Sequence, residues 1–218
     1  MATFVKSIQP KSATQIAEPP IARFLFADTR IAWLWLIVRL YVGYQWIAAG
    51  FDKLTGYSIS IGSFGKSTGA AWVFNAQQGV AMKGFAMGAI AKASSPSPAV
   101  QGWYAEFLRN VVVPNATLFS YMVTFGEVLI GLGLIFGALT GIAAFFGVFM
   151  NLNFLLAGTV SINPVIGMLA LLLVLAWRVA GYYGIDRYLL PLLGTPWTGS
   201  LARKDTKSAD PVAAPALK

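Results

Sequence analysis

Four apolar blocks, each close to 20 residues long, constrain this chain more than any other feature of its sequence. A helix needs roughly 20 residues to cross about 30 Å of hydrocarbon, because each residue advances the helix axis by about 1.5 Å. The blocks predict an all-α membrane protein, a bundle of four transmembrane helices over residues 31–50, 116–139, 141–160 and 165–183. The turns at Thr140 and at 161–164 are so short that the helices they join are expected to be antiparallel neighbours.

The charged residues fit a membrane protein and exclude a nucleic-acid partner. Only 11% of the 218 residues are charged and 57% are hydrophobic, whereas about a quarter of an average soluble domain is charged. The net charge of +8 comes mainly from lysines and arginines outside the four blocks, with no interleaved aromatic stripe of the kind that binds nucleic acid. We therefore expect the lipid membrane as the first partner, with further membrane or peripheral subunits.

The basic residues also predict how the chain is oriented. Both ends of the chain are rich in lysine and arginine, which favour the cytoplasmic side. We expect a cytoplasmic arm over 1–29 without a cleaved signal peptide, a membrane domain over 30–197 and a disordered cytoplasmic tail over 198–218. The loop over 55–115 is then extracytoplasmic, although its own Lys66, Lys83, Lys92 and Arg109 weigh against this orientation.

The long loop is expected to contain short helices at the membrane surface. Residues 70–91 are apolar but interrupted by glycines and by polar residues such as Asn75 and Lys83. We interpret them as interfacial or re-entrant, and a fifth span stays open as the alternative. Residues 103–113 predict a short helix whose aromatic rings suit the headgroup boundary.

Histidine and cysteine are both absent from the sequence. Iron–sulfur clusters, bis-histidine haem, the usual zinc sites and serine–histidine nucleophiles all need these residues. We expect no metal, haem or covalent cofactor of the chain's own, and assign no catalytic residue. Any redox chemistry must use a bound organic cofactor, for which quinone is the candidate, or the centre of a partner.

A few polar residues inside the blocks are the candidate ligand-binding residues. Ionisable groups in a membrane cost about 2.5–3.5 kcal/mol to insert and usually face a partner in the bundle. Arg39 lies about 12 Å into the first block and Glu127 about 16 Å into the second, antiparallel one, so the two are expected to pair near the midplane. Asn151 and Asn153 lie at similar depth on different faces of the third block.

Trp46 is a further candidate, because it follows Arg39 by seven residues and shares its helix face. A polar pocket for the head of a quinone or another small ligand is one interpretation of this cluster. The other is an ion pair that fixes helix register, with the asparagines as hydrogen bonds between helices.

Three stretches of the sequence resemble the DoxX/DoxD family, which includes the DoxD-type subunit of thiosulfate:quinone oxidoreductase. They are GYQWIAAGFDKLTG (43–56), FGEVLIGLGLIFGALTGIAAFFGVFMNLNFLLAGTVSINP (125–164) and AWRVAGYYGIDRYLLPLLGTPW (176–197). The resemblance implies a four-helix subunit of a bacterial or archaeal cytoplasmic membrane that works with a partner in quinone-linked oxidation of sulfur compounds. Lys53 and Glu127 fall on matched positions, which makes Lys53 a candidate site residue as well.

Two functions remain open at this point. The first is a membrane subunit of a quinone-linked oxidoreductase, which the resemblance favours. The second is a non-catalytic accessory or structural subunit of a larger respiratory or photosynthetic complex, which the missing histidine and cysteine favour.

Overall fold

The computed structural model describes residues 19–69 and 71–194, in which the regular secondary structure is helical apart from one isolated β-bridge between Tyr57 and Ser67. The chain begins with α1 (Pro20–Ala27) and a 3₁₀ turn (Thr29–Ile31), followed by the long helix α2 (Ala32–Thr55). After a loop come α3 (Val80–Ala93), α4 (Gly102–Phe107) and a π-helical turn (Leu108–Val112). The remaining helices are α5 (Ala116–Phe136), α6 (Thr140–Leu156), α7 (Asn163–Leu175), α8 (Trp177–Ala180) and α9 (Asp186–Leu192).

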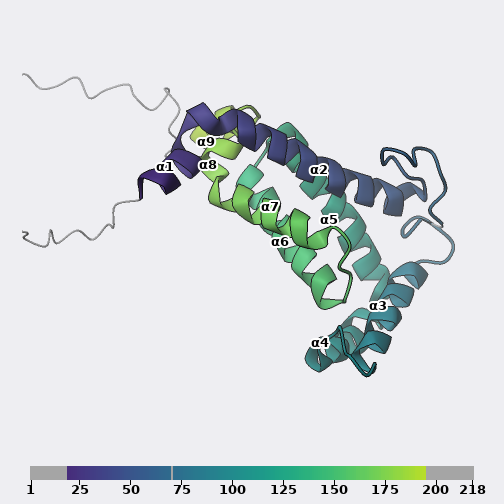
Figure 1. Cartoon of the computed structure of the whole chain (residues 1–218). Coiled ribbons are helices and arrows are strands. Elements are labelled where there is room, and N and C mark those ends of the chain that lie inside the picture. The colour runs from purple at the N-terminus through teal and green to yellow at the C-terminus, as the bar shows by residue number, and fades with distance from the viewer. Residues whose placement is uncertain (1–18, 70, 195–218) are drawn as a thin grey trace, which may run out of the picture.

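Helices α2, α5, α6 and α7 lie alongside one another and form the main body of the molecule (Figure 1). The most extensive interface joins α2 and α5. It is close because glycines lie at the contact: a Cβ added at Gly131 would be 2.6 Å from the backbone nitrogen of Ile47, and one added at Gly50 would be 2.9 Å from that of Val128. Small residues at such contacts let helix backbones approach each other in a membrane.

Two hydrophobic clusters divide the core. The first is built from α2, α5, α6, α7 and α8, and the second joins α3, α4 and the π-helical turn to the start of α5. Figure 1 shows α3 and α4 at one end of the molecule and α1, α8 and α9 at the other. The described segments nearest to both chain termini therefore lie at the same end.

The outer surface of the bundle is apolar. Leu118 and Leu129 of α5, Phe149 of α6 and Met168 of α7 all expose more than half of their surface, which soluble proteins rarely do over contiguous patches. Among the described residues, two segments are long and apolar enough to span a membrane: Thr29–Thr55, with a mean hydropathy of 1.3, and α5, with 1.8. Helices α6 and α7 are apolar but shorter, at 17 and 13 residues. These helices indicate a multi-pass membrane protein, and four spans remain a prediction.

The helix boundaries differ from the predicted blocks at several points, and α5 and α6 already end before the predicted 139 and 160, at Phe136 and Leu156. α2 continues past Gly50, because that glycine packs against α5 instead of ending the helix. The helix ends at Gly56, which has a left-handed φ of 76° and whose N–H donates to the carbonyl of Asp52. The block predicted over 165–183 is divided at Ala176 into α7 and α8.

The long loop matches the prediction in part. The short helix expected over 103–113 is present as α4 and the π-helical turn. Among the described residues 71–91, only those from Val80 onward are helical, and α3 has 14 residues, fewer than a span needs. The predicted tail over 198–218 and most of the predicted arm over 1–29 lie outside the described residues.

Candidate functional site

The Glu127 carboxylate is paired with Lys53. The Nζ atom of Lys53 lies 2.7 Å and 2.9 Å from the two carboxylate oxygens. The Glu127 side chain is 1% exposed, and the ring of Trp72 lies 5.3 Å from the same Nζ atom. The last turn of α2 thus brings a lysine to a carboxylate buried on α5.

The predicted pair between Arg39 and Glu127 is wrong. α5 packs on α2 in a register that places Glu127 and Val128 opposite Gly50. Arg39 lies eleven residues before Gly50, about 16 Å away along the helix. The predicted depths of Arg39 and Glu127 assumed that the first helix ends at Gly50. α2 instead continues to Thr55, more than one turn further.

Arg39 is instead enclosed at the opposite end of the bundle. Its side chain is buried, and its Nη2 donates to the carbonyl of Tyr183 at 3.1 Å. Its Nη1 packs against Gly137 and Gly184, and the Asp186 carboxylate attracts its charge. The guanidinium is thus surrounded by backbone atoms and glycines, and its Nε and Nη1 have no hydrogen-bond partner among the described residues.

Asp186 closes the same end of the bundle. Its two carboxylate oxygens accept the N–H groups of Leu139 at 2.5 Å and Thr140 at 2.8 Å. These amides lie at the start of α6, where unpaired N–H groups favour a negative charge. Arg39 and Asp186 therefore join the first long helix, the α5–α6 turn and α9.

Trp46 and Asn151 are buried inside the bundle. The Trp46 ring stacks on Phe154 with centres 6.3 Å apart, and Gly147 packs beside its indole nitrogen. Asn151 lies against Gly167 of α7. Neither the indole N–H nor the Asn151 amide has a hydrogen-bond partner within the described residues.

Asn153 lies on a different face of α6 from Asn151, as the sequence predicted. The hydroxyl of Tyr104 donates to the Asn153 side-chain and main-chain oxygens, both at 3.1 Å. The Asn153 amide in turn donates to the carbonyl of Phe149 at 2.8 Å. Burial raises the pKa of the Tyr104 phenol, so the hydroxyl keeps its proton and acts as a donor.

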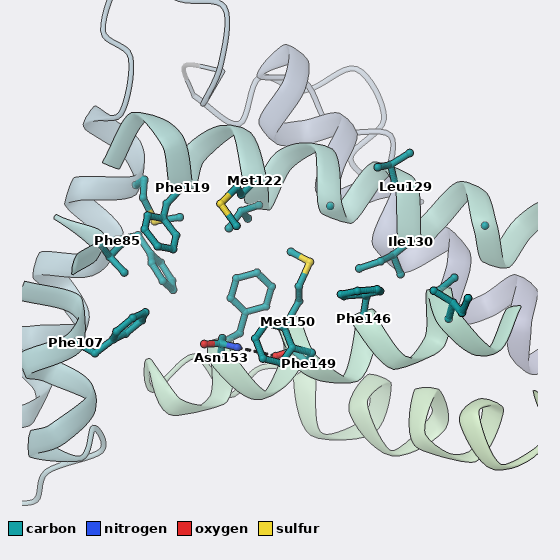
Figure 2. A pocket seen from close by; sticks show the side chains of 18 of the residues that line it. Phe85, Phe107, Phe119, Met122, Leu129, Ile130, Phe146, Phe149, Met150 and Asn153 are labelled. Carbon is teal, nitrogen blue, oxygen red and sulfur yellow. Dashed lines mark hydrogen bonds between the residues drawn. The ribbon is translucent and has the colours of Figure 1, made fainter. Parts of the chain in front are cut away.

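This polar pair lies at one end of an apolar groove of about 640 Å³. The groove runs between α5 and α6, from α4 and the π-helical turn to the α5–α6 turn. Along α5 its lining residues extend from Phe119 to Gly133, which is about 21 Å of helix. Figure 2 shows the side chains around it, including Phe85, Phe107, Phe119, Met122, Phe146, Phe149 and Met150, with Asn153 among them.

Of the predicted site residues, only Asn153 lines the groove. The other five lie outside the groove. Lys53 is paired with Glu127, and Arg39 lies near Tyr183 and Asp186. Trp46 and Asn151 are buried inside the bundle. Sequence reasoning missed Tyr104 and the groove itself. The available signal was the pair Gly126 and Gly133, seven residues apart on one face of α5 beside Met122 and Leu129, all of which line the groove.

Within residues 19–69 and 71–194, no three acidic, histidine or cysteine side chains come together in a way that could hold a metal ion. The expectation that the chain carries no metal of its own remains a prediction.

Comparison with models of protein families matches DoxX over residues 34–160, a stretch that begins in α2 and extends past the end of α6. No curated protein and no solved structure gives a match.

Proposed function

This membrane protein belongs to the DoxX family, because the family match covers more than half of the 218 residues of the chain. We propose that it is a subunit of a quinone-linked oxidoreductase complex. In this proposal the groove between α5 and α6 binds the quinone. A complex that oxidises thiosulfate, as the family resemblance implies, is the form we propose first.

The observation that carries the proposal is an elongated apolar groove with one polar pair at its end. Ligand pockets of about 300–1,000 Å³ with a few polar groups are typical of small-molecule sites, and this groove falls in that range. A membrane quinone has a polar ring with two carbonyl oxygens and a long apolar tail. The ring would lie at Tyr104 and Asn153, and the tail would follow the apolar walls along α5.

The donors present suit a quinone oxygen. The Tyr104 hydroxyl and the Asn153 amide can each donate to a carbonyl, in exchange for their present bonds within the protein. No sulfur-compound or electron-donating centre is assigned to this chain. The electrons would come from a partner subunit, and this chain would hold the acceptor.

The alternative function is a non-catalytic accessory subunit of a larger respiratory or photosynthetic complex. The absence of histidine and cysteine favours it, because the usual metal and haem redox centres need these residues as ligands. The two functions differ in whether the isolated chain retains a quinone.

The test measures quinone retained by the purified protein after lipid extraction, by chromatography and mass spectrometry. Met122→Trp would fill the groove, and Leu118→Trp is its matched control, since both residues lie on α5 and are 58% exposed but only Met122 lines the groove. We expect the Met122→Trp protein to retain several-fold less quinone, Tyr104→Phe to retain less, and Leu118→Trp to match the unaltered chain. Quinone that is absent, or retained equally by all folded variants, would support the accessory function instead.

A further inference from the structure

The loop that follows α2 turns back along the outside of that helix. The hydroxyl of Tyr44 accepts the N–H of Ile61 at 3.0 Å and donates to the carbonyl of Ile59 at 3.3 Å. Tyr44 lies eleven residues before the end of α2 at Thr55, about 16 Å back along the axis. A tyrosine side chain covers less than half of that distance. The loop tip therefore lies beside the helix and not beyond its end, as Figure 1 also shows.

The backbone of this loop is largely satisfied from within. Six further amides donate to acceptors inside the segment 56–68: Ser58 to Lys66, Ser60 to the Ser58 hydroxyl, Ser63 to Ser60, Gly65 to Ser58, Lys66 to Ser63 and Thr68 to Gly56. The hydroxyls of Ser58 and Ser63 also bond to each other at 2.8 Å. Internal pairing of this kind is what irregular backbone needs when it leaves water for a bilayer.

The remaining amides indicate how deep such a loop can lie. Those of Ile59, Gly62, Phe64 and Ser67 have no hydrogen bond among the described residues. An unpaired amide is costly in hydrocarbon but not at the headgroup boundary, where water still reaches it. The loop is therefore suited to a shallow position.

The side chains at the tip are apolar and point away from the protein. Ile61 is 93% exposed and Phe64 is 79% exposed, and Lys66 is the only charged residue in 57–68. On the adjacent α2 surface, Tyr41 and Phe51 are exposed as well. The tip thus continues the apolar surface that α2 presents to lipid.

We propose that residues 57–68 form a membrane-inserted loop, with Ile61 and Phe64 in the lipid at the headgroup–acyl boundary and Tyr44 as the tether that holds the loop against α2. The partner of this surface is the lipid bilayer on the side of the membrane where α2 ends. The continuity with the apolar face of α2 and the internally paired backbone favour lipid over a partner protein.

The chain has no cysteine, so single cysteines can be labelled without further changes. Ile61→Cys and Phe64→Cys proteins would carry an environment-sensitive nitrobenzoxadiazole label, in phosphatidylcholine vesicles that contain the purified protein alone. Nitroxide lipids with the quencher near the headgroup or deep in the acyl chain report insertion, and aqueous iodide reports exposure to water. Met168→Cys on the outer surface of α7, which does not line the groove, is the reference for lipid, and the labelled free amino acid is the reference for water.

We expect blue-shifted emission at both loop positions, stronger quenching by the shallow than by the deep nitroxide, and iodide quenching several-fold weaker than for the labelled free amino acid. Quenching by iodide as strong as in water, with no quenching by either nitroxide lipid, would overturn the proposal and leave a protein partner as the occupant.

A second variant tests the tether. Tyr44→Phe keeps the ring but removes the hydroxyl that binds Ile59 and Ile61. In the Ile61→Cys background we expect weaker quenching by the shallow nitroxide lipid and stronger quenching by iodide. Unchanged quenching would show that Tyr44 does not hold the loop in place.

Discussion

Lys53 reaches Glu127 from the last turn of a membrane helix, an arrangement that lets a long side chain bring its charge inward from the boundary. The stem of a lysine can lie along apolar surface while its ammonium group finds a polar partner. Here the ammonium group is held by both carboxylate oxygens and by the Trp72 ring. The charge on Glu127 is thereby compensated without any group from the centre of the bundle.

We predict that Lys53 and Glu127 depend on each other. Removing one partner of a buried pair costs about 3–5 kcal/mol, because the other charge is left uncompensated. Lys53→Met and Glu127→Gln should each lower the melting temperature in detergent, and the double variant should lose less than the sum of the two. Simple addition of the losses would show that the pair is not coupled.

The control for this experiment is the exposed pair of Glu106 and Arg109, whose side chains are both about half exposed. Surface pairs contribute about 0–1 kcal/mol. Arg109→Met should therefore leave the melting temperature almost unchanged.

Gly137 allows a second prediction at single-residue scale. Its φ is 65°, and a Cβ there would overlap the Arg39 guanidinium. Gly65 has a similar φ of 73° but open space around it. A side chain in this left-handed conformation costs about 1–2 kcal/mol by itself. Gly65→Ala should lose about that much stability, and Gly137→Ala should lose clearly more. Equal losses would show that Arg39 can move aside.

At the scale of the helices, most of the architecture could be predicted from the sequence, because apolar blocks and short turns are local patterns. The blocks located α2, α5, α6 and α7, and the turns between them required antiparallel neighbours. The register of α5 on α2 could not be predicted, since it depends on how Gly43, Gly50 and Gly131 fit the facing backbone. The pairing of Arg39 with Glu127 failed for that reason.

The groove could not be predicted for a related reason. It is formed by α3 and α4 closing one end of the space between α5 and α6. Tyr104 and Asn153 are 49 positions apart in the chain, and no spacing rule connects them. The opposite faces of Asn151 and Asn153 were predictable, because residues two apart in a helix always diverge.

The glycine contacts lead to a prediction about helix packing. Gly131→Ala would place a methyl group 2.6 Å from the Ile47 backbone nitrogen, which cannot rotate away. Overpacking of this kind costs about 1–3 kcal/mol. Gly88→Ala is the matched control in α3, where open space surrounds the glycine and the change should stabilise the helix by about 0.5–1 kcal/mol. Thermal unfolding in detergent should therefore move in opposite directions for the two variants. A Gly131→Ala protein as stable as the unaltered chain would contradict the close α2–α5 contact.

For the whole molecule, the common location of α1, α8 and α9 agrees with an even number of membrane crossings. The described basic residues do not distinguish the two sides. Arg23, Arg30, Arg178 and Arg187 lie toward one end of the bundle, and the loop carries Lys66, Lys83, Lys92 and Arg109. The bias comes from the lysines and arginines near the chain termini, outside the described residues.

We predict four spans with both termini cytoplasmic. Single cysteines at Ser7, Ser97 and Ser208 can be labelled from outside intact cells with a membrane-impermeant maleimide. Only the one at 97 should react, because lysine and arginine are retained on the cytoplasmic side. Labelling at 7 or 208 would contradict this topology, and labelling after lysis is the control for reactivity at all three positions.

The way Arg39 is enclosed also has a consequence for how the protein is made. The carbonyl that binds its guanidinium belongs to Tyr183, 144 positions later in the chain, and Asp186 follows three residues after that. At about 5–20 residues per second, the ribosome needs on the order of ten seconds to supply them after Arg39 has emerged. During that interval α2 carries an uncompensated charge that the insertion machinery or water must accommodate. A nascent chain that stops before Tyr183 never acquires these partners, so the charge on Arg39 stays uncompensated.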